Sequence, residues 1–160
     1  MKKTGWIAFA LLVAVALTGC NQESTAADQA VELWQIDYDG AVKQAAKENK
    51  FILVNVSGSE WCVWCKRLDK EVFSQPAFIE FARDNLICVL LDFDGFGKPV
   101  STEFAARHQE LLERYQVQGF PTVLIQNPQG VTVARTGYQP GGAENYINYI
   151  KKIIAGNQKK

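Results

Sequence analysis

Residues 51–68 of the chain read FILVNVSGSEWCVWCKRL, and this stretch decides the fold. It begins with an almost continuously apolar run, residues 51–56, which is rich in β-branched side chains and predicts a short strand covered on both faces. Residues 57–60 (SGSE) interrupt that pattern, and a helix is predicted from about Cys62 to Phe73. The C-x-x-C pair therefore stands where a buried strand passes into a helix, which is the context that gives this motif a redox meaning.

The two cysteines of this pair, Cys62 and Cys65, have the positions that thiol chemistry requires. At the start of the helix, Cys62 meets unpaired backbone N–H groups and the positive end of the helix dipole, both of which favour a thiolate. Cys65 follows one turn later on the same face and can close a disulfide with it. Lys66 and Arg67 add positive charge nearby, which Glu60 partly opposes. We therefore expect Cys62 to attack a substrate disulfide and Cys65 to resolve the mixed disulfide, without a bound cofactor.

Two other roles for the cysteine pair are a static disulfide and a metal site. A structural zinc site normally has four ligands, and the candidates for the other two, His108 and Cys88, are poor ones because both lie in apolar patterns. Copper(I) can bind two thiolates, so a copper(I)-binding metallochaperone stays open as an alternative. We predict no metal site.

Hydrophobic periodicity on either side of this stretch predicts the remaining elements. The predicted helices cover residues 38–50, a segment from Pro76 to about residue 82, 101–115 and 144–155, and the predicted strands cover 86–93, 121–126 and 131–136. Residues 127–130 (NPQG) have turn composition and should join the last two strands as an antiparallel pair. This order predicts an α/β fold with a central mixed sheet of about four strands and helices on both faces.

Several single residues stand out against these elements. Cys88 is alone in an apolar run and is expected to be buried, because an unpaired thiol in an oxidising compartment must be hidden. His108 is the only histidine, and its place with Phe104 on the apolar face of a helix favours a structural role. Asp92 and Asp94 follow the second buried strand and are expected to be solvated strand-end and loop residues.

The first residues of the chain predict export and a lipid anchor. Residues 1–19 combine Lys2 and Lys3 with an apolar run that is short of the roughly 20 residues a membrane-spanning helix needs. The run ends in LTGC, which resembles a bacterial lipobox, so Cys20 is expected to be acylated and to hold the protein at a lipid membrane. An ordinary cleaved signal with an incidental cysteine is the alternative. The predicted division is a leader over 1–19, a flexible tether over 20–36, a folded domain over 37–156 and a polar tail over 157–160.

The charge balance argues against nucleic acid as a partner. The 160 residues include 17 Lys and Arg and 17 Asp and Glu, and removal of the leader would leave the protein about two charges negative. A basic footprint of the kind that binds nucleic acid is therefore not indicated.

From about residue 38 to 155 the chain resembles the thioredoxin superfamily on three landmarks. They are the strand followed by WCVWCK (61–66), the GFPT segment (119–122), and the hairpin with its closing helix. Within the superfamily, residues 60–76 resemble a bacterial thioredoxin-like lipoprotein group typified by WCxxCKxLdkeVF. The C-terminal domain of the periplasmic electron-transfer reductase of the Dsb system is also similar. The resemblance implies a thioredoxin-like fold.

The resemblance also implies how the site is built. A cis peptide between Phe120 and Pro121 would place that loop beside Cys62, where its backbone can pair with a substrate strand. Trp61, Trp64 and Phe120 would form an apolar rim around the sulfurs and contact substrate together with Pro121. For Trp64, packing on its own helix is the alternative.

Two features depart from thioredoxin. Thioredoxins commonly have a buried carboxylate in the strand before the active site that assists proton transfer, whereas the best-aligned residue here is the neutral Asn55. Either Glu60 or water would have to take the proton, and we assign no general base. The Val63-Trp64 dipeptide also differs from the Gly-Pro of thioredoxin, so the reduction potential of thioredoxin cannot be transferred to this chain.

The function implied is that of a periplasmic, membrane-anchored thiol:disulfide oxidoreductase, an enzyme that reduces protein disulfides through Cys62 and Cys65. Its electron donor would be a membrane reductase. A disulfide oxidant or isomerase is the alternative within the same class. The expected location is a lipid anchor facing the periplasm, and Asn21, which stands in place of the aspartate linked to inner-membrane retention, favours the outer membrane.

Overall fold

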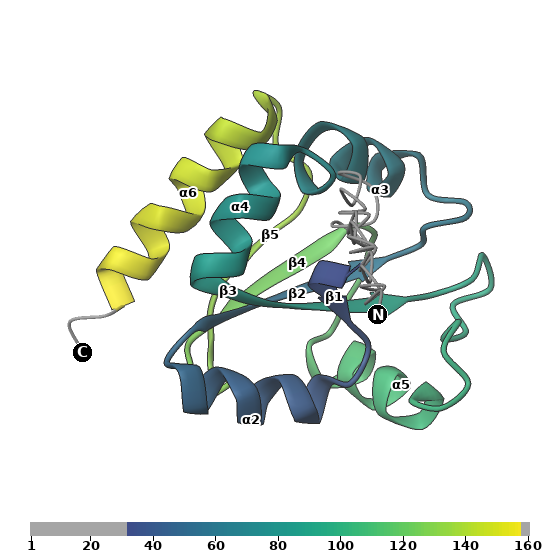
Figure 1. The fold of residues 1–160 in the computed structure, drawn as a ribbon. Coiled ribbons are helices and arrows are strands. Elements are labelled where there is room, and N and C mark those ends of the chain that lie inside the picture. Colours follow the sequence, from purple (N-terminus) through teal and green to yellow (C-terminus); the bar gives the residue numbers. More distant parts are fainter. Residues whose placement is uncertain (1–31, 158–160) are drawn as a thin grey trace, which may run out of the picture.

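The computed structural model describes residues 32–157, which form one layered α/β domain (Figure 1). The predictions for the leader, for Cys20 and for most of the tether and tail lie outside the described residues. The elements are β1 (Trp34–Gln35), α2 (Tyr38–Glu48), β2 (Phe51–Ser57), α3 (Val63–Leu68), the π-helical turn η1 (Asp69–Phe73), α4 (Pro76–Asn85), β3 (Leu86–Asp92), α5 (Ala105–Arg114), β4 (Thr122–Gln126), β5 (Thr132–Thr136) and α6 (Gly142–Asn157).

The five strands form one mixed sheet in the order β1-β3-β2-β4-β5. Strands β1, β3 and β2 run parallel, while β4 is antiparallel to β2 and β5 is antiparallel to β4. The expected mixed sheet is confirmed, but it has one strand more than the four predicted. The additional strand is β1, whose two residues pair with Cys88 and Val89 and lie inside the range predicted to be tether. Two residues are too few to show a strand period, so only the tertiary structure defines this strand.

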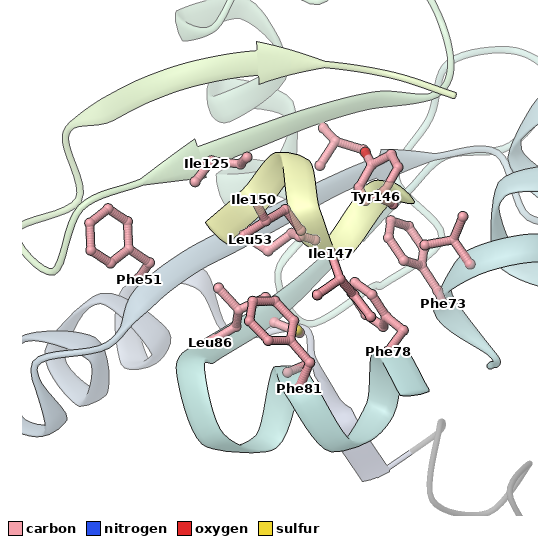
Figure 2. Packing of buried hydrophobic residues seen from close by; sticks show 14 of the residues in the cluster. Phe51, Leu53, Phe73, Phe78, Phe81, Leu86, Ile125, Tyr146, Ile147 and Ile150 are labelled. Atoms are coloured by element: carbon pink, nitrogen blue, oxygen red, sulfur yellow. The ribbon is translucent and has the colours of Figure 1, made fainter. Parts of the chain in front are cut away.

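Helices cover both faces of the sheet, as predicted (Figure 1). Alternate residues of β2 belong to two different apolar clusters, one on each face of the sheet, because successive side chains of a strand point to opposite faces. Leu53 packs with η1, α4 and α6 in one cluster, and Ile52 and Val54 pack with α2 and α5 in the other. Figure 2 shows the first cluster, in which the ring of Phe73 lies 4.9 Å from that of Phe78 and 5.8 Å from that of Tyr146.

Local signals set the helix ends that frame the site. Pro76 begins α4 at a position where its missing N–H costs nothing. The helix predicted from Cys62 to Phe73 is present but changes after Leu68 into the π-helical turn η1. Five residues cannot reveal such a change from their apolar spacing. The helix predicted from residue 101 begins only at Ala105, since residues 101–104 form a turn that precedes it.

Candidate active site

The C-x-x-C pair lies at the start of α3, directly after the loop that follows β2. Cys62 is the N-cap residue of α3, and its Sγ accepts a hydrogen bond from the backbone N–H of Cys65 at 3.1 Å. The two sulfurs form a disulfide, with the Cα atoms 5.2 Å apart. The exposed fractions of Cys62 and Cys65 are only 6% and 4%, so the groups around the sulfurs decide what can reach them.

The loop before Cys62 is held by hydrogen bonds to its own backbone and to the end of β3. The carbonyl oxygen of Gly58 accepts from the backbone N–H of Cys62 at 2.8 Å, which closes the turn. The backbone N–H and the hydroxyl of Ser59 donate to the carboxylate of Asp92 at 2.8 and 2.5 Å. Asp92 ends β3 as expected, and its partly exposed carboxylate also anchors this loop. This contact could not be predicted from a single sequence, because the two residues are 33 positions apart.

Trp61 connects the C-x-x-C segment to the loop around Pro121. Its indole N–H donates to the carbonyl oxygen of Phe93 at 2.9 Å, and its ring meets the ring of Phe120 edge-on, with centroids 5.4 Å apart. The peptide bond between Phe120 and Pro121 is cis, as the resemblance implied. The structure thus brings two of the expected rim residues, Trp61 and Phe120, into contact.

Trp64 lies in a second aromatic group, formed with the segment that follows β5. The residue is 52% exposed, and its ring lies 5.3 Å from the ring of Tyr138 and 5.6 Å from the guanidinium carbon of Arg67. Trp64 therefore packs partly on its own helix and also keeps half of its surface open. The contact with Tyr138 had no signal in the sequence, because it joins two distant segments.

A carboxylate, Glu71, organises this group from the next turn of the helix. It accepts a hydrogen bond from the hydroxyl of Tyr138 at 2.6 Å and one from Nε of Arg67 at 2.7 Å. Both hydrogen bonds lower the pKa of Glu71, and the bond from Tyr138 has the larger effect. In turn, the carboxylate of Glu71 raises the pKa of Tyr138. The i,i+4 spacing of Arg67 and Glu71 could have predicted their ion pair from the sequence.

Cys65 borders a cavity of about 190 Å³ whose lining includes both polar and apolar groups. Asn55, Ser57 and Lys66 contribute to its wall together with Cys65 itself. Asn55 is 8% exposed, and within the described part of the chain its Oδ1 atom has no hydrogen-bond partner. The ammonium group of Lys66 donates to the backbone oxygen of Glu60 at 2.6 Å, so it is held beside this cavity.

The other residues singled out in the sequence lie away from the sulfurs. Cys88 is 1% exposed in the apolar core, as expected, and burial raises the pKa of its thiol. His108 is also 1% exposed, and its Nε2 atom pairs with the backbone oxygen of Ile36 at 2.9 Å while its ring stacks on Phe104. Asp94 organises its own loop by accepting two backbone hydrogen bonds, so it too is more than a solvated residue.

Two properties of residues 32–157 concern membranes and metals. None of the helices in that range is long and apolar enough to cross a bilayer. Within the same range, no three His, Cys, Asp or Glu side chains are grouped so that they could hold a metal ion.

Comparisons with known proteins point to one family. A model of the thioredoxin-like domain matches residues 38–154. The disulfide bond reductase DsbH of Chlamydia pneumoniae is 29% identical over 137 residues, which cover 86% of this chain and 82% of that protein. The thiol:disulfide interchange protein DsbD of Pseudomonas fluorescens is 32% identical over 95 residues, 59% of this chain but only 14% of that longer protein.

Solved structures agree with the sequence comparisons. The structure of a DsbH oxidoreductase superposes with a TM-score of 0.70 at 30% identity, and the match covers 76% of this chain and 83% of that one. A thioredoxin from Thermus thermophilus has the same fold, with a TM-score of 0.58 at 20% identity over 75% of this chain and 85% of the other. Fold, cis peptide and matched residues together establish that this chain belongs to the family of thioredoxin-like domains.

Proposed function

We propose that this chain is an exported, lipid-anchored thiol:disulfide oxidoreductase that reduces protein disulfides through Cys62 and Cys65. The observation that carries the proposal is the disulfide between these residues at the start of α3, with the cis Phe120–Pro121 loop held nearby through Trp61. Reactive cysteines lie at helix N-termini, where the thiolate is stabilised, and Cys62 occupies such a position.

The chemistry transfers two electrons from the dithiol to the substrate. The thiolate of Cys62 attacks one sulfur of a substrate disulfide, which forms a mixed disulfide and releases the other substrate sulfur as a thiolate. The thiolate of Cys65 then attacks Sγ of Cys62, which forms the intramolecular disulfide and releases the second substrate thiol. The enzyme ends oxidised and must receive two electrons before the next cycle.

Geometry supports Cys62 as the attacking sulfur. The backbone N–H of Cys65 already points at Sγ of Cys62, and such a donor stabilises a thiolate more than a thiol. Cys65, unlike Cys62, lines the cavity, where its proton must leave when it resolves the mixed disulfide. Asn55 cannot accept that proton as a carboxylate would, so another acceptor such as Glu60 or water has to take it, and we assign no general base.

The direction of electron flow is proposed from the relatives. DsbH is named a disulfide bond reductase, and DsbD is named a thiol:disulfide interchange protein. By the same chemistry, this domain reduces protein disulfides and is recharged by a membrane reductase, because thioredoxin reductase of the cytosol does not reach an exported domain. Acylation of Cys20 would keep the domain at the membrane surface, facing the periplasm and on the outer membrane.

The first test is the reduction potential of the Cys62–Cys65 pair, measured by equilibration in defined thiol buffers and trapping of free thiols. We expect a value near the roughly −270 mV of thioredoxin, whereas a value near about −120 mV would make the protein an oxidant and overturn the proposed direction. A Cys65→Ser variant should accumulate mixed disulfides with substrate, and a Cys62→Ser variant should not. Tight copper(I) binding with negligible disulfide exchange would instead favour the metallochaperone.

The anchor needs its own test, since it concerns residues outside the described structure. Cells that express the full chain should incorporate labelled palmitate into it, and a Cys20→Ala variant should lose the label and leave the membrane fraction. Label that persists in the Cys20→Ala variant would exclude Cys20 as the attachment point.

A further inference from the structure

A second cavity, of about 430 Å³, lies where β1 and β3 end and α5 begins. Its lining comes from Ile36 after β1, from Leu90 and Asp92 of β3, and from residues 100–103 and His108 around the start of α5. Neither cysteine of the C-x-x-C pair contributes to it, so this cavity is separate from the sulfurs.

His108 brings an unused hydrogen-bond acceptor to this cavity. Its Nε2 atom lies 2.9 Å from the backbone oxygen of Ile36, and because a carbonyl oxygen can only accept, Nε2 carries the proton. Nδ1 of the neutral ring is therefore an acceptor, and within residues 32–157 this buried atom has no hydrogen-bond partner. A buried acceptor that stays unpaired costs free energy, so a donor from outside the domain would be bound favourably here.

Two carboxylates, those of Asp92 and Glu103, add negative charge to the same lining. Asp92 accepts both hydrogen bonds of Ser59, and each of its oxygens can accept a further bond. Glu103 forms no salt bridge with another residue of the described part of the chain. Among the described residues that line the cavity there is no Lys or Arg, so its charge favours a cation.

The rest of the lining is largely aliphatic. Ile36, Leu90 and Val100 contribute to it, and Ile36 and Val100 are 44% and 52% exposed. Acceptors beside an aliphatic wall match a group that has a hydrocarbon stem and ends in several donors. The arginine side chain has this form, because its guanidinium group has five N–H donors, accepts no hydrogen bond and is more weakly hydrated than an ammonium group.

We propose that this cavity binds an arginine side chain of a partner protein, with the guanidinium group at the two carboxylates and Nδ1 of His108 and the stem along the aliphatic wall. The occupant belongs to a protein because the residues next to the arginine can cover Ile36 and Val100, which a free cation leaves exposed. Since Asp92 also holds Ser59, a partner docked here contacts the residue that anchors the loop before Cys62. The binding itself needs no disulfide exchange, so it does not depend on the proposed function.

The test titrates the oxidised full chain with acetyl-arginine amide and with acetyl-citrulline amide, which has nearly the same shape but no charge. We expect the arginine amide to bind saturably and to shift the ¹⁵N resonance of Nδ1 of His108, and the citrulline amide to do neither. Glu103→Gln should weaken binding of the arginine amide about threefold, as expected for an exposed ion pair. Glu144→Gln is the matched control and should leave binding unchanged, because α6 packs on the opposite face of the sheet from α5 (Figure 1).

The peptide acetyl-Leu-Arg-Leu-amide tests whether the arginine comes from a protein. It should bind about fivefold more tightly than acetyl-arginine amide because its leucines cover the exposed aliphatic residues, and Val100→Ser should remove most of that gain. Equal binding of the arginine and citrulline amides would overturn the inference, as would unchanged binding in Glu103→Gln. Spermidine that binds more tightly than the peptide would assign the cavity to a free polyamine and would overturn it too. Failure to reduce protein disulfides, measured separately, would overturn the proposed function and leave this inference standing.

Discussion

Replacement of Gly58 by alanine tests whether the packing of Trp61 supports the site. A Cβ atom at Gly58 would lie 2.5 Å from Cε2 and 2.6 Å from Nε1 of Trp61, closer than real side chains approach. The indole ring must therefore move outward, which is open to it because it is already 44% exposed. When the ring moves, it leaves both the carbonyl oxygen of Phe93 and the ring of Phe120.

The cost follows from those two contacts. A net hydrogen bond is worth about 1 kcal/mol, and an edge-to-face aromatic pair contributes about 1 kcal/mol beyond its buried area. We therefore expect the Gly58→Ala variant to lose about 2 kcal/mol of unfolding free energy. With a urea m-value of about 2 kcal/mol per molar, that loss lowers the unfolding midpoint by about 1 M.

The control is Gly95→Ala, which also adds a methyl group against Trp61 but at 3.8 Å, so it should leave the midpoint unchanged. Urea unfolding of the oxidised protein, followed by far-UV circular dichroism, compares the two variants with the wild type. The displaced rim should also slow peptide reduction by Gly58→Ala more than by Gly95→Ala. Equal midpoints for the two variants would refute the argument, because both lie beside the same ring and differ only in the distance of approach.

Three further predictions concern titratable and buried groups. In the reduced native protein, iodoacetamide should modify Cys62 quickly but Cys88 only after denaturant is added, because burial raises the pKa of the Cys88 thiol. Mass spectrometry after timed labelling measures both modifications. The pKa of Glu71 in the folded protein is lowered, chiefly by the hydrogen bond from Tyr138. The ionised carboxylate therefore stabilises the fold fully at pH values above the pKa of Glu71 in the unfolded chain. This contribution is lost as the pH falls through the pKa of Glu71 in the folded protein. Glu71→Gln should therefore be less stable than the wild type at pH 6, and the difference should shrink as pH falls below about 4.3, in urea titrations at each pH. Asn55→Asp would bury a carboxyl group whose pKa rises on folding. In the same titrations, this variant should therefore lose stability relative to the wild type as the pH rises above about 4. The loss should be about 1.4 kcal/mol for each unit by which folding raises the pKa.

Much of the fold could be predicted because its strongest signals are local. The buried strands β2 and β3 are almost continuously apolar, and the face of α5 that packs on the sheet repeats at helical spacing. Strand β1 could not be predicted, since its two residues become a strand only through pairing with β3. The π-helical turn η1 also went unpredicted, because one turn is too short for its period to be read.

The site divides in the same way between local and distant contacts. The disulfide between Cys62 and Cys65 follows from a spacing of three residues, and the cis peptide before Pro121 followed from family resemblance. The hydrogen bonds of Ser59 with Asp92 and of Glu71 with Tyr138 join segments that are 33 and 67 residues apart. Such pairs have no periodicity, so a single sequence cannot indicate them.

These distant contacts predict that the disulfide opens without disturbing its surroundings. On one side, Ser59 and Trp61 attach the loop before Cys62 to the end of β3. On the other side, Trp64 and Glu71 attach α3 and η1 to the segment after β5 through Tyr138. None of these contacts involves a sulfur atom, so reduction removes only the bond between the two cysteines while the backbone around them stays anchored. Because the site is held from both sides, little substrate binding energy is needed to rearrange it. Such preorganisation favours rapid thiol–disulfide exchange in either redox state.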